Sequence, residues 1–237
     1  MVTALFAFFW GLANSPLFYV NDLDLLAPDH ETYALAAGAI RVPATASTLF
    51  YPVSRIERQV ATIPQIQGVD IERLPLHGLR IRVYRRTPVA LAPTPAGCFL
   101  VGADGVLAGL VPPGKPLPRL PVLDGLHLSG AHPGDRLPEW PTWLMAQTTR
   151  AATDAGLTGA WHLDCSRPFE LRLTAGGVEG FLGGTDNLER KVHLFASLRQ
   201  ELKKRGKRPA YIDVRVMERP VWREAKAAAP RGDSLGH

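Results

Sequence analysis

The chain has 237 residues, 46% of them hydrophobic, so it can bury one large core or two ordinary ones and is not a disordered protein. Its formal net charge of +5 would suit a nucleic-acid binder, but the basic residues are spread along the chain and form no single stripe. Cys98 and Cys165 are too few for a disulfide framework and lack metal-ligand spacing, so we expect two small buried side chains.

The N-terminal segment is apolar and indicates a membrane anchor. No charged residue occurs from Val2 to Ala13, and apolar residues resume from Leu17 to Val20. A helix that crosses a bilayer needs about 20 mostly apolar residues, so the segment suffices when it is counted to Val20. The first lysine or arginine is Arg41, which leaves the orientation open, and the segment lacks a clear basic start and cleavage site of a signal peptide. We predict an uncleaved anchor over residues 1–17; a buried helix of a soluble fold is the alternative.

The next part of the chain predicts a small module in the order strand, helix, helix, strand, strand. The second helix is the clearest, because apolar residues from Val53 to Ile63 recur every three or four positions between Pro52 and Pro64. The last strand, around Leu79 to Tyr84, alternates between apolar and polar residues. The expected ranges are 17–26, 30–40, 52–63, 69–73 and 79–84. The module contains no cluster of acids, bases or nucleophiles, so we expect it to recognise something and not to transform it.

Short strands and two helices are predicted after Pro88. We expect a hairpin, a proline-rich loop, a helix, three antiparallel strands, a second helix and a last strand. The corresponding ranges are 99–107, 111–121, 140–155, 161–165, 169–174, 178–182, 186–205 and 210–216. Val221 to Arg223 is a short apolar addition, and residues 224–237 lack aromatic residues and periodicity, which predicts a disordered tail.

The second helix of this region carries two terminal signals. Asp186, followed by Glu189 three residues later, predicts the N-cap. Lys203, Lys204 and Arg205 stand where the helix dipole favours cations, and a glycine follows them. This helix-end explanation competes with a polybasic binding patch over residues 203–208, and we favour the helix end.

Three possible catalytic or ligand sites are weak. The glycines between residues 176 and 184 fall in a turn and a strand, and no phosphate-binding G-K-[ST] motif follows them. His162 and Asp164 lie on one face of their predicted strand and Cys165 on the other, so they do not form a triad. His193 is expected on the surface. We expect no catalytic residue, cofactor or metal.

The chain resembles the FtsQ/DivIB family of bacterial cell-division proteins over nearly its whole length. The resemblance rests on short motifs that occur in the family's order. They are Ile63-Pro64, then Leu79-Arg80-Ile81-Arg82-Val83 running into Arg86-Thr87-Pro88-Val89-Ala90, then Asp104-Gly105-Val106, Leu120-Pro121-Val122-Leu123-Asp124-Gly125, Leu182-Gly183 with Lys191, and Tyr211-Ile212-Asp213-Val214-Arg215.

The resemblance implies an α+β protein with a membrane anchor, a β-α-α-β-β POTRA domain over residues 18–90 and a β domain over 91–223. The β domain is expected to have a mostly antiparallel sheet with helices packed on it. Members of the family are single-pass inner-membrane proteins whose bulk is extracytoplasmic at the division septum. They are not enzymes, and they bind the coiled-coil proteins FtsB and FtsL and help to regulate septal peptidoglycan synthesis.

A last strand can leave one sheet edge unpaired for a partner strand, and we expect that edge at the end of the chain. The predicted edge residues are Tyr211, Ile212, Asp213, Val214, Arg215 and Val216. Tyr211 and Trp222 would be aromatic anchors unless they pack on the sheet, and Arg215 or Arg167 would pair with acidic partner residues. The alternatives are a POTRA-type transport or assembly protein and an extracytoplasmic hydrolase.

Overall fold

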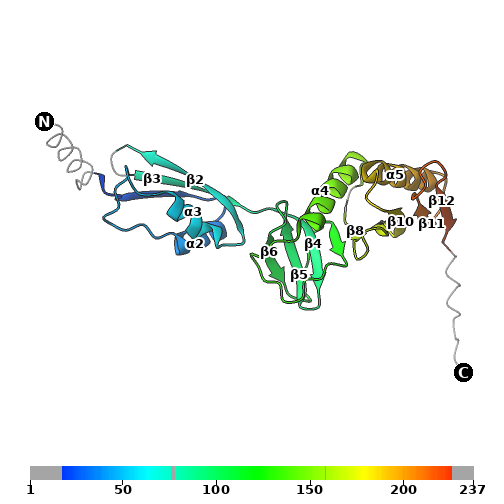
Figure 1. Cartoon of the computed structure of the whole chain (residues 1–237), viewed down its shortest axis with the longest axis horizontal. Helices are drawn as coiled ribbons and strands as arrows, with labels where there is room; N and C mark the ends of the chain where they lie inside the picture. Colours follow the sequence, from blue (N-terminus) through cyan, green and yellow to red (C-terminus); the bar gives the residue numbers. More distant parts are fainter. Residues whose placement is uncertain (1–17, 76–77, 158, 226–237) are drawn as a thin grey trace, which may run out of the picture. The chain divides into compact units, whose positions relative to one another are not determined.

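The computed structural model describes residues 18–75, 78–157 and 159–225 (Figure 1). The predicted anchor over residues 1–17 lies outside these ranges, as does the tail after residue 225. The described chain is a mixed α+β fold that divides into two compact units. The first unit runs to Pro88 and also includes Val106–Leu110 and His132–Arg136, and the second contains the other residues from Val89 onward.

The first unit has the predicted order of elements. They are β1 (Asp22–Leu26), α2 (His30–Ala39), α3 (Ser54–Ala61), β2 (Ile66–Leu74) and β3 (Gly78–Arg85). β3 is the central strand of a three-stranded sheet, parallel to β1 and antiparallel to β2. Its alternation has the expected effect, because Leu79, Ile81 and Val83 are buried together with Ile56 and Val60 of α3.

Two arginines, the last residue of β3 and the residue after it, hold the C-terminal end of β3 in place. Arg86 donates from Nε to the carbonyl oxygen of Pro64 at 2.9 Å and from Nη2 to that of Ile66 at 2.8 Å. Arg85 pairs with Asp29, the N-cap of α2, and with Glu31 in its first turn. These bonds hold the exit of β3 to the start of β2 and to the start of α2.

The remaining elements build a large, mostly antiparallel sheet and two helices. The sheet order is β12-β11-β10-β9-β8-β7-β4-β5-β6, with parallel pairs at β4–β7, β7–β8 and β10–β11. The elements are β4 (Pro88–Thr94), β5 (Gly97–Gly102), β6 (Leu107–Val111), β7 (Val122–Asp124), α4 (Glu139–Asp154), β8 (Trp161–Asp164), β9 (Leu171–Ala175), β10 (Val178–Gly183), α5 (Leu188–Lys204), β11 (Pro209–Asp213) and β12 (Val221–Glu224).

α5 is the connection that places β11 beside β10. It packs on both strands and on α4. Its Phe195 is fully buried over Gly180, where a Cβ would stand 2.6 Å from the phenyl ring. Because the connection from β10 to β11 passes through a helix, the two strands run parallel.

Five points of the sequence prediction need correction in this region. The N-cap of α5 is Asn187, at φ 51°, because Asp186 instead accepts a hydrogen bond from Lys191. β4 was not expected, since it begins at a proline and contains another, Pro93. The strand predicted to reach Val216 ends at Asp213, and the stretch read as an apolar addition forms β12. Glu224 therefore belongs to a strand and not to the predicted tail.

Candidate partner-binding edge

The outer strand at the C-terminal end of the large sheet is β12, not β11. β11 pairs with β10 on one side, where Ile212 faces Gly180, and with β12 on the other, where Ile212 faces Trp222. The prediction that residues 211–216 form a free edge is therefore wrong. The chain turns back after β11, and the four residues of β12 cover the side that would otherwise be open.

Two of the predicted contact residues lie in the core. Ile212 and Val214 are completely buried, and the Val214 N–H donates to the carbonyl oxygen of Phe181 at 3.1 Å. Neither side chain is accessible to a partner, so both are corrected to core positions. Val216 is exposed but lies beyond the end of the strand.

β12 is exposed along its whole length. The N–H of Ala225, just after it, donates to the carbonyl oxygen of Arg208 at 2.8 Å, on the β11 side. Because N–H groups alternate in direction along a strand, those of Trp222 and Glu224 point away from β11, to the free side. The outer side of β12 therefore has donors available for another strand.

The two faces of this edge differ in chemistry. Side chains alternate across the sheet, so Trp222 shares the α5 face with its partner Ile212 and remains 38% exposed. Tyr211 and Asp213 lie on the opposite face, as do their partners Arg223 and Val221. One partner strand added here would meet a tryptophan on one face and polar and aromatic groups on the other.

An aromatic ring flanked by two cations lies on the face opposite α5. The Phe181 ring has Tyr211 edge-on at 5.4 Å between ring centroids. The guanidinium carbons of Arg172 and Arg215 stand 5.2 and 5.9 Å from its centroid. Phe181, Arg172 and Arg215 line an open depression over β9 and β10 together with the highly exposed Phe169.

The arginines of this surface have partners within the chain. Arg215 donates to Asp213 at 2.6 Å, Arg172 to Glu179 at 3.2 Å and Arg167 to Glu170 at 2.7 Å. Hydrogen bonds from Arg215 hold the pKa of Asp213 below its usual value. Exposed pairs of this kind contribute about 0–1 kcal/mol, so a carboxylate from a partner can replace them at little cost.

Arg172, Phe181 and Phe169 complete this surface but were not singled out from the sequence. Arg172 and Phe181 are opposite each other in the β9–β10 pair. Alternation along these strands predicts that both face away from the core, but their approach to Arg215 depends on β11 lying beside β10. No local pattern encodes that strand order.

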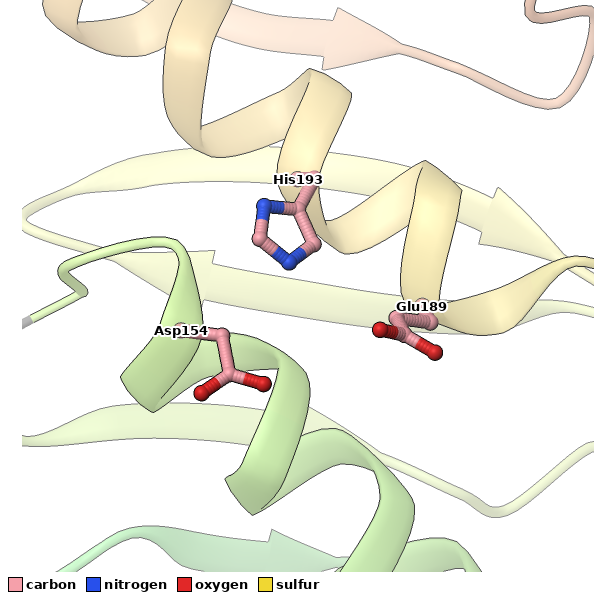
Figure 2. Close-up of side chains that lie close together, drawn as sticks. All are labelled: Asp154, Glu189 and His193. Atoms are coloured by element: carbon pink, nitrogen blue, oxygen red, sulfur yellow. The ribbon is translucent and has the colours of Figure 1, made fainter.

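One cluster elsewhere has metal-ligand chemistry. Asp154 of α4 and Glu189 and His193 of α5 each offer a ligand atom, all within 4.8 Å of one another (Figure 2). A zinc ion with bonds near 2.1 Å needs neighbouring donors about 3.4 Å apart. Both carboxylates are exposed, and Arg150 Nε stands 3.9 Å from Asp154. We therefore assign no metal to this cluster; His193, predicted on the surface, is half-buried.

His162, Asp164 and Cys165, which the sequence analysis rejected as a triad, are not positioned for nucleophilic catalysis. His162 Nδ1 lies 3.3 Å from the Asp124 carboxylate, whereas the buried Cys165 thiol donates to the backbone oxygen of Asp124 at 2.9 Å. Burial raises the pKa of Cys165 to about 11, so the thiol is protonated at neutral pH. This geometry gives no support to a hydrolase. Both cysteines are free, and both are buried, as the sequence predicted.

Within the part of the chain that the structure describes, no helix has the length and apolar character needed to cross a membrane. Comparison with protein-family models and with curated proteins finds no match to this chain.

Proposed function

We propose that this chain is a non-catalytic, membrane-anchored scaffold of the bacterial division machinery, of the FtsQ/DivIB kind. It recruits FtsB-like and FtsL-like coiled-coil proteins and through them regulates septal cell-wall synthesis. The single observation that carries the proposal is the exposed outer strand β12. The surface of Phe181, Arg172 and Arg215 lies farther into the same sheet, on β10, on β9 and just after β11. The order of the sequence motifs supports the choice of this family.

The proposed binding mode is the addition of a partner strand to β12. Backbone hydrogen bonds to the free side would give affinity, and side-chain contacts on the two faces would give specificity. Trp222 would anchor the partner on the α5 face, because a partly exposed tryptophan has a large apolar area to bury. Acidic residues in a part of the partner that continues across the face opposite α5 would meet Arg215, which follows β11, and then Arg172 on β9.

The experiment is co-purification of the tagged full-length chain from dividing cells, with FtsB-like and FtsL-like proteins quantified by mass spectrometry. Trp222→Ala removes the aromatic anchor and keeps the backbone N–H, whereas Trp222→Pro removes both. We expect Trp222→Ala to weaken binding and Trp222→Pro to weaken it further by roughly ten-fold, the equivalent of about 1.4 kcal/mol.

The matched control is Trp143→Ala, which removes another exposed tryptophan, on α4 and away from β12. It should leave co-purification unchanged. Full recovery of both partners with Trp222→Pro, in a variant that unfolds at the wild-type temperature, would reject the edge as the binding site. Absence of division proteins from the wild-type sample would reject the proposed function itself.

A further inference from the structure

A short loop of the first unit is tied to the residues that follow the apolar N-terminal segment. We call residues 46–51 the foot loop. Val20 donates from its N–H to the carbonyl oxygen of Ala46 at 2.8 Å. Thr48 donates to the carbonyl oxygen of Phe18, from its N–H at 2.8 Å and from its hydroxyl at 3.2 Å. These hydrogen bonds fix the position of the foot loop relative to Phe18.

The foot loop is a built structure with a hydrophobic tip. Tyr51 is buried and its N–H donates to the carbonyl oxygen of Ser47 at 2.8 Å, closing a turn. The Arg73 guanidinium donates to the carbonyl oxygens of Thr48 and Tyr51 on either side of the tip. At the tip itself, Leu49 is 49% exposed and Phe50 is 67% exposed.

We propose that the foot loop inserts Leu49 and Phe50 into the lipid interface beside the anchor. This inference rests on the proposed function, which places the uncharged segment before Phe18 in a membrane. Phe50 is two residues from Thr48, a span of about 7 Å at most, and Thr48 is hydrogen-bonded to Phe18. An anchor that ends near Phe18 therefore brings Phe50 to the depth of the headgroups, where aromatic side chains are favoured.

The charges around the tip suit an anionic lipid surface. Arg73 supports the tip directly, and Arg41 is joined to the loop because the Tyr51 hydroxyl donates to its carbonyl oxygen at 3.3 Å. The exposed Arg73 cation directly behind an apolar tip matches a layer of phosphate headgroups above acyl chains. The Arg41 guanidinium donates to the carbonyl oxygens of Ala37 and Ile40, at the end of α2. The nearest acidic residue along the chain from Val20 is Asp22, and the next one, Asp24, is paired with Arg80 at 2.8 Å.

The sheet of the first unit then points away from the bilayer. β1 runs parallel to β3 and Asp22 faces Gly78, so the end of the sheet at Phe18 is also the start of β3. Eight residues of strand carry the chain to Arg85, a distance of about 25 Å. Two attachments, the anchor and the foot loop, would restrict the tilt of this unit more than the anchor alone.

The test uses the full-length chain in vesicles of phosphatidylethanolamine and phosphatidylglycerol that contain a spin-labelled lipid quencher. An environment-sensitive fluorophore is attached at Phe50→Cys and, in a separate sample, at Tyr84→Cys. Tyr84 is the matched control, an exposed aromatic residue (47%) near the opposite end of β3. The native cysteines are buried, so labelling is directed to the new site.

We expect the lipid quencher to remove most of the fluorescence at position 50 and none at position 84 beyond background. Because the label replaces Phe50, hydrogen exchange of residues 46–51 in the unlabelled chain is the second measurement, and it should slow in vesicles compared with detergent. Equal, weak quenching at both positions, in a chain that floats with the vesicles, would reject the insertion of the foot loop into lipid and leave the scaffold proposal intact.

If the chain does not float with the vesicles, the proposed membrane anchor is rejected, and with it the membrane-anchored scaffold. Protection of residues 46–51 that depends on protein concentration in detergent, without quenching by lipid, would assign the tip to self-association and also overturn the inference.

Discussion

Gly125 lies so close to Ser166 that a Cβ on the glycine would stand 2.5 Å from the Ser166 amide nitrogen. Gly125 follows β7 and Ser166 follows β8, and these strands are parallel neighbours with Asp124 opposite Asp164. The two chain segments therefore leave the sheet side by side. The glycine is needed at this position both for its left-handed φ of +79° and for the space.

Gly125→Ala should destabilise the protein more than Gly114→Ala. Gly114 has a similar φ of +84° but nothing within 4 Å of an added Cβ. Both variants lose about 1–2 kcal/mol from the left-handed conformation. Gly125→Ala should lose about 1–3 kcal/mol more, because its neighbour is backbone and cannot rotate away. Urea denaturation measures both free energies of unfolding, and equal losses would show that crowding contributes nothing.

A buried lysine gives a second prediction. Lys191 is 2% exposed, and its ammonium donates to the Gly184 carbonyl oxygen at 3.3 Å and to the exposed Asp186 carboxylate at 3.0 Å. Lys191→Ala should cost about 2 kcal/mol from lost burial of its methylene groups. Lys191→Met keeps most of that volume and removes the buried charge, so its loss should be smaller. A larger loss for methionine than for alanine would contradict this reading.

The same pair predicts a pH dependence. The hydrogen bond from Lys191 lowers the pKa of Asp186 below its usual value of 3.8. A carboxyl group whose pKa is lowered by folding stabilises the folded state above its unfolded pKa and loses that contribution as the pH falls through the folded pKa. Stability should therefore fall below about pH 4 in the wild type and fall less in Lys191→Met. Denaturation curves of both proteins at about pH 3 and about pH 6, on either side of that value, measure the difference.

Much of the fold follows from local sequence patterns. The apolar spacing in α3 and the alternation in β3 are set by burial on one face, so helix and strand periods predicted both elements and their buried residues. The glycine pair at 176 and 177 joins β9 to β10, and the antiparallel order of β8, β9 and β10 was also predicted correctly. These features depend on neighbours that are close in sequence.

The candidate site depends on neighbours that are distant in sequence. A four-residue strand such as β12 has too few positions to show an alternation of apolar and polar residues, and Pro220 just before it is typical of a loop. The sequence predicted Ile212 on the edge strand and Trp222 as an aromatic anchor, but only the pairing of β11 with β12 decides that Ile212 is internal and Trp222 lies on the outer strand. The chemistry of Arg215 was identifiable, whereas its neighbours Arg172 and Phe181 were set by strand order.

The buried thiols predict slow modification of the folded chain. Burial raises the pKa of Cys165 to about 11 and also raises that of Cys98. Thiol reagents react with the thiolate, so neither cysteine should be modified at pH 8 until the protein unfolds. Between about pH 9 and pH 11 the Cys165 thiol ionises in the unfolded chain but stays protonated in the folded protein. The free energy of unfolding should therefore decrease as the pH rises through this range. Rapid modification of either cysteine in the folded protein would place that thiol at the surface.

The cation–aromatic surface on β9 and β10 predicts a salt-dependent step in partner binding. Arg172 and Arg215 both flank Phe181, so Arg172→Ala with Arg215→Ala removes the positive charge and leaves the ring and the β12 backbone in place. We expect affinity for the FtsB-like partner to fall roughly ten-fold at low salt and less at high salt, since screening weakens the pairs in the wild type.

The control for this surface is Arg150→Ala, which removes an exposed arginine that is 3.9 Å from Asp154 on α4. Arg150 carries the same charge but lies on α4, outside the sheet edge, so the total charge changes while the surface at Phe181 does not. The control removes one charge and the paired variant two, so a loss of binding free energy half as large for Arg150→Ala would attribute binding to the net positive charge of the chain. Binding by the paired variant that is unchanged at every salt concentration would leave backbone pairing at β12 as the main source of affinity.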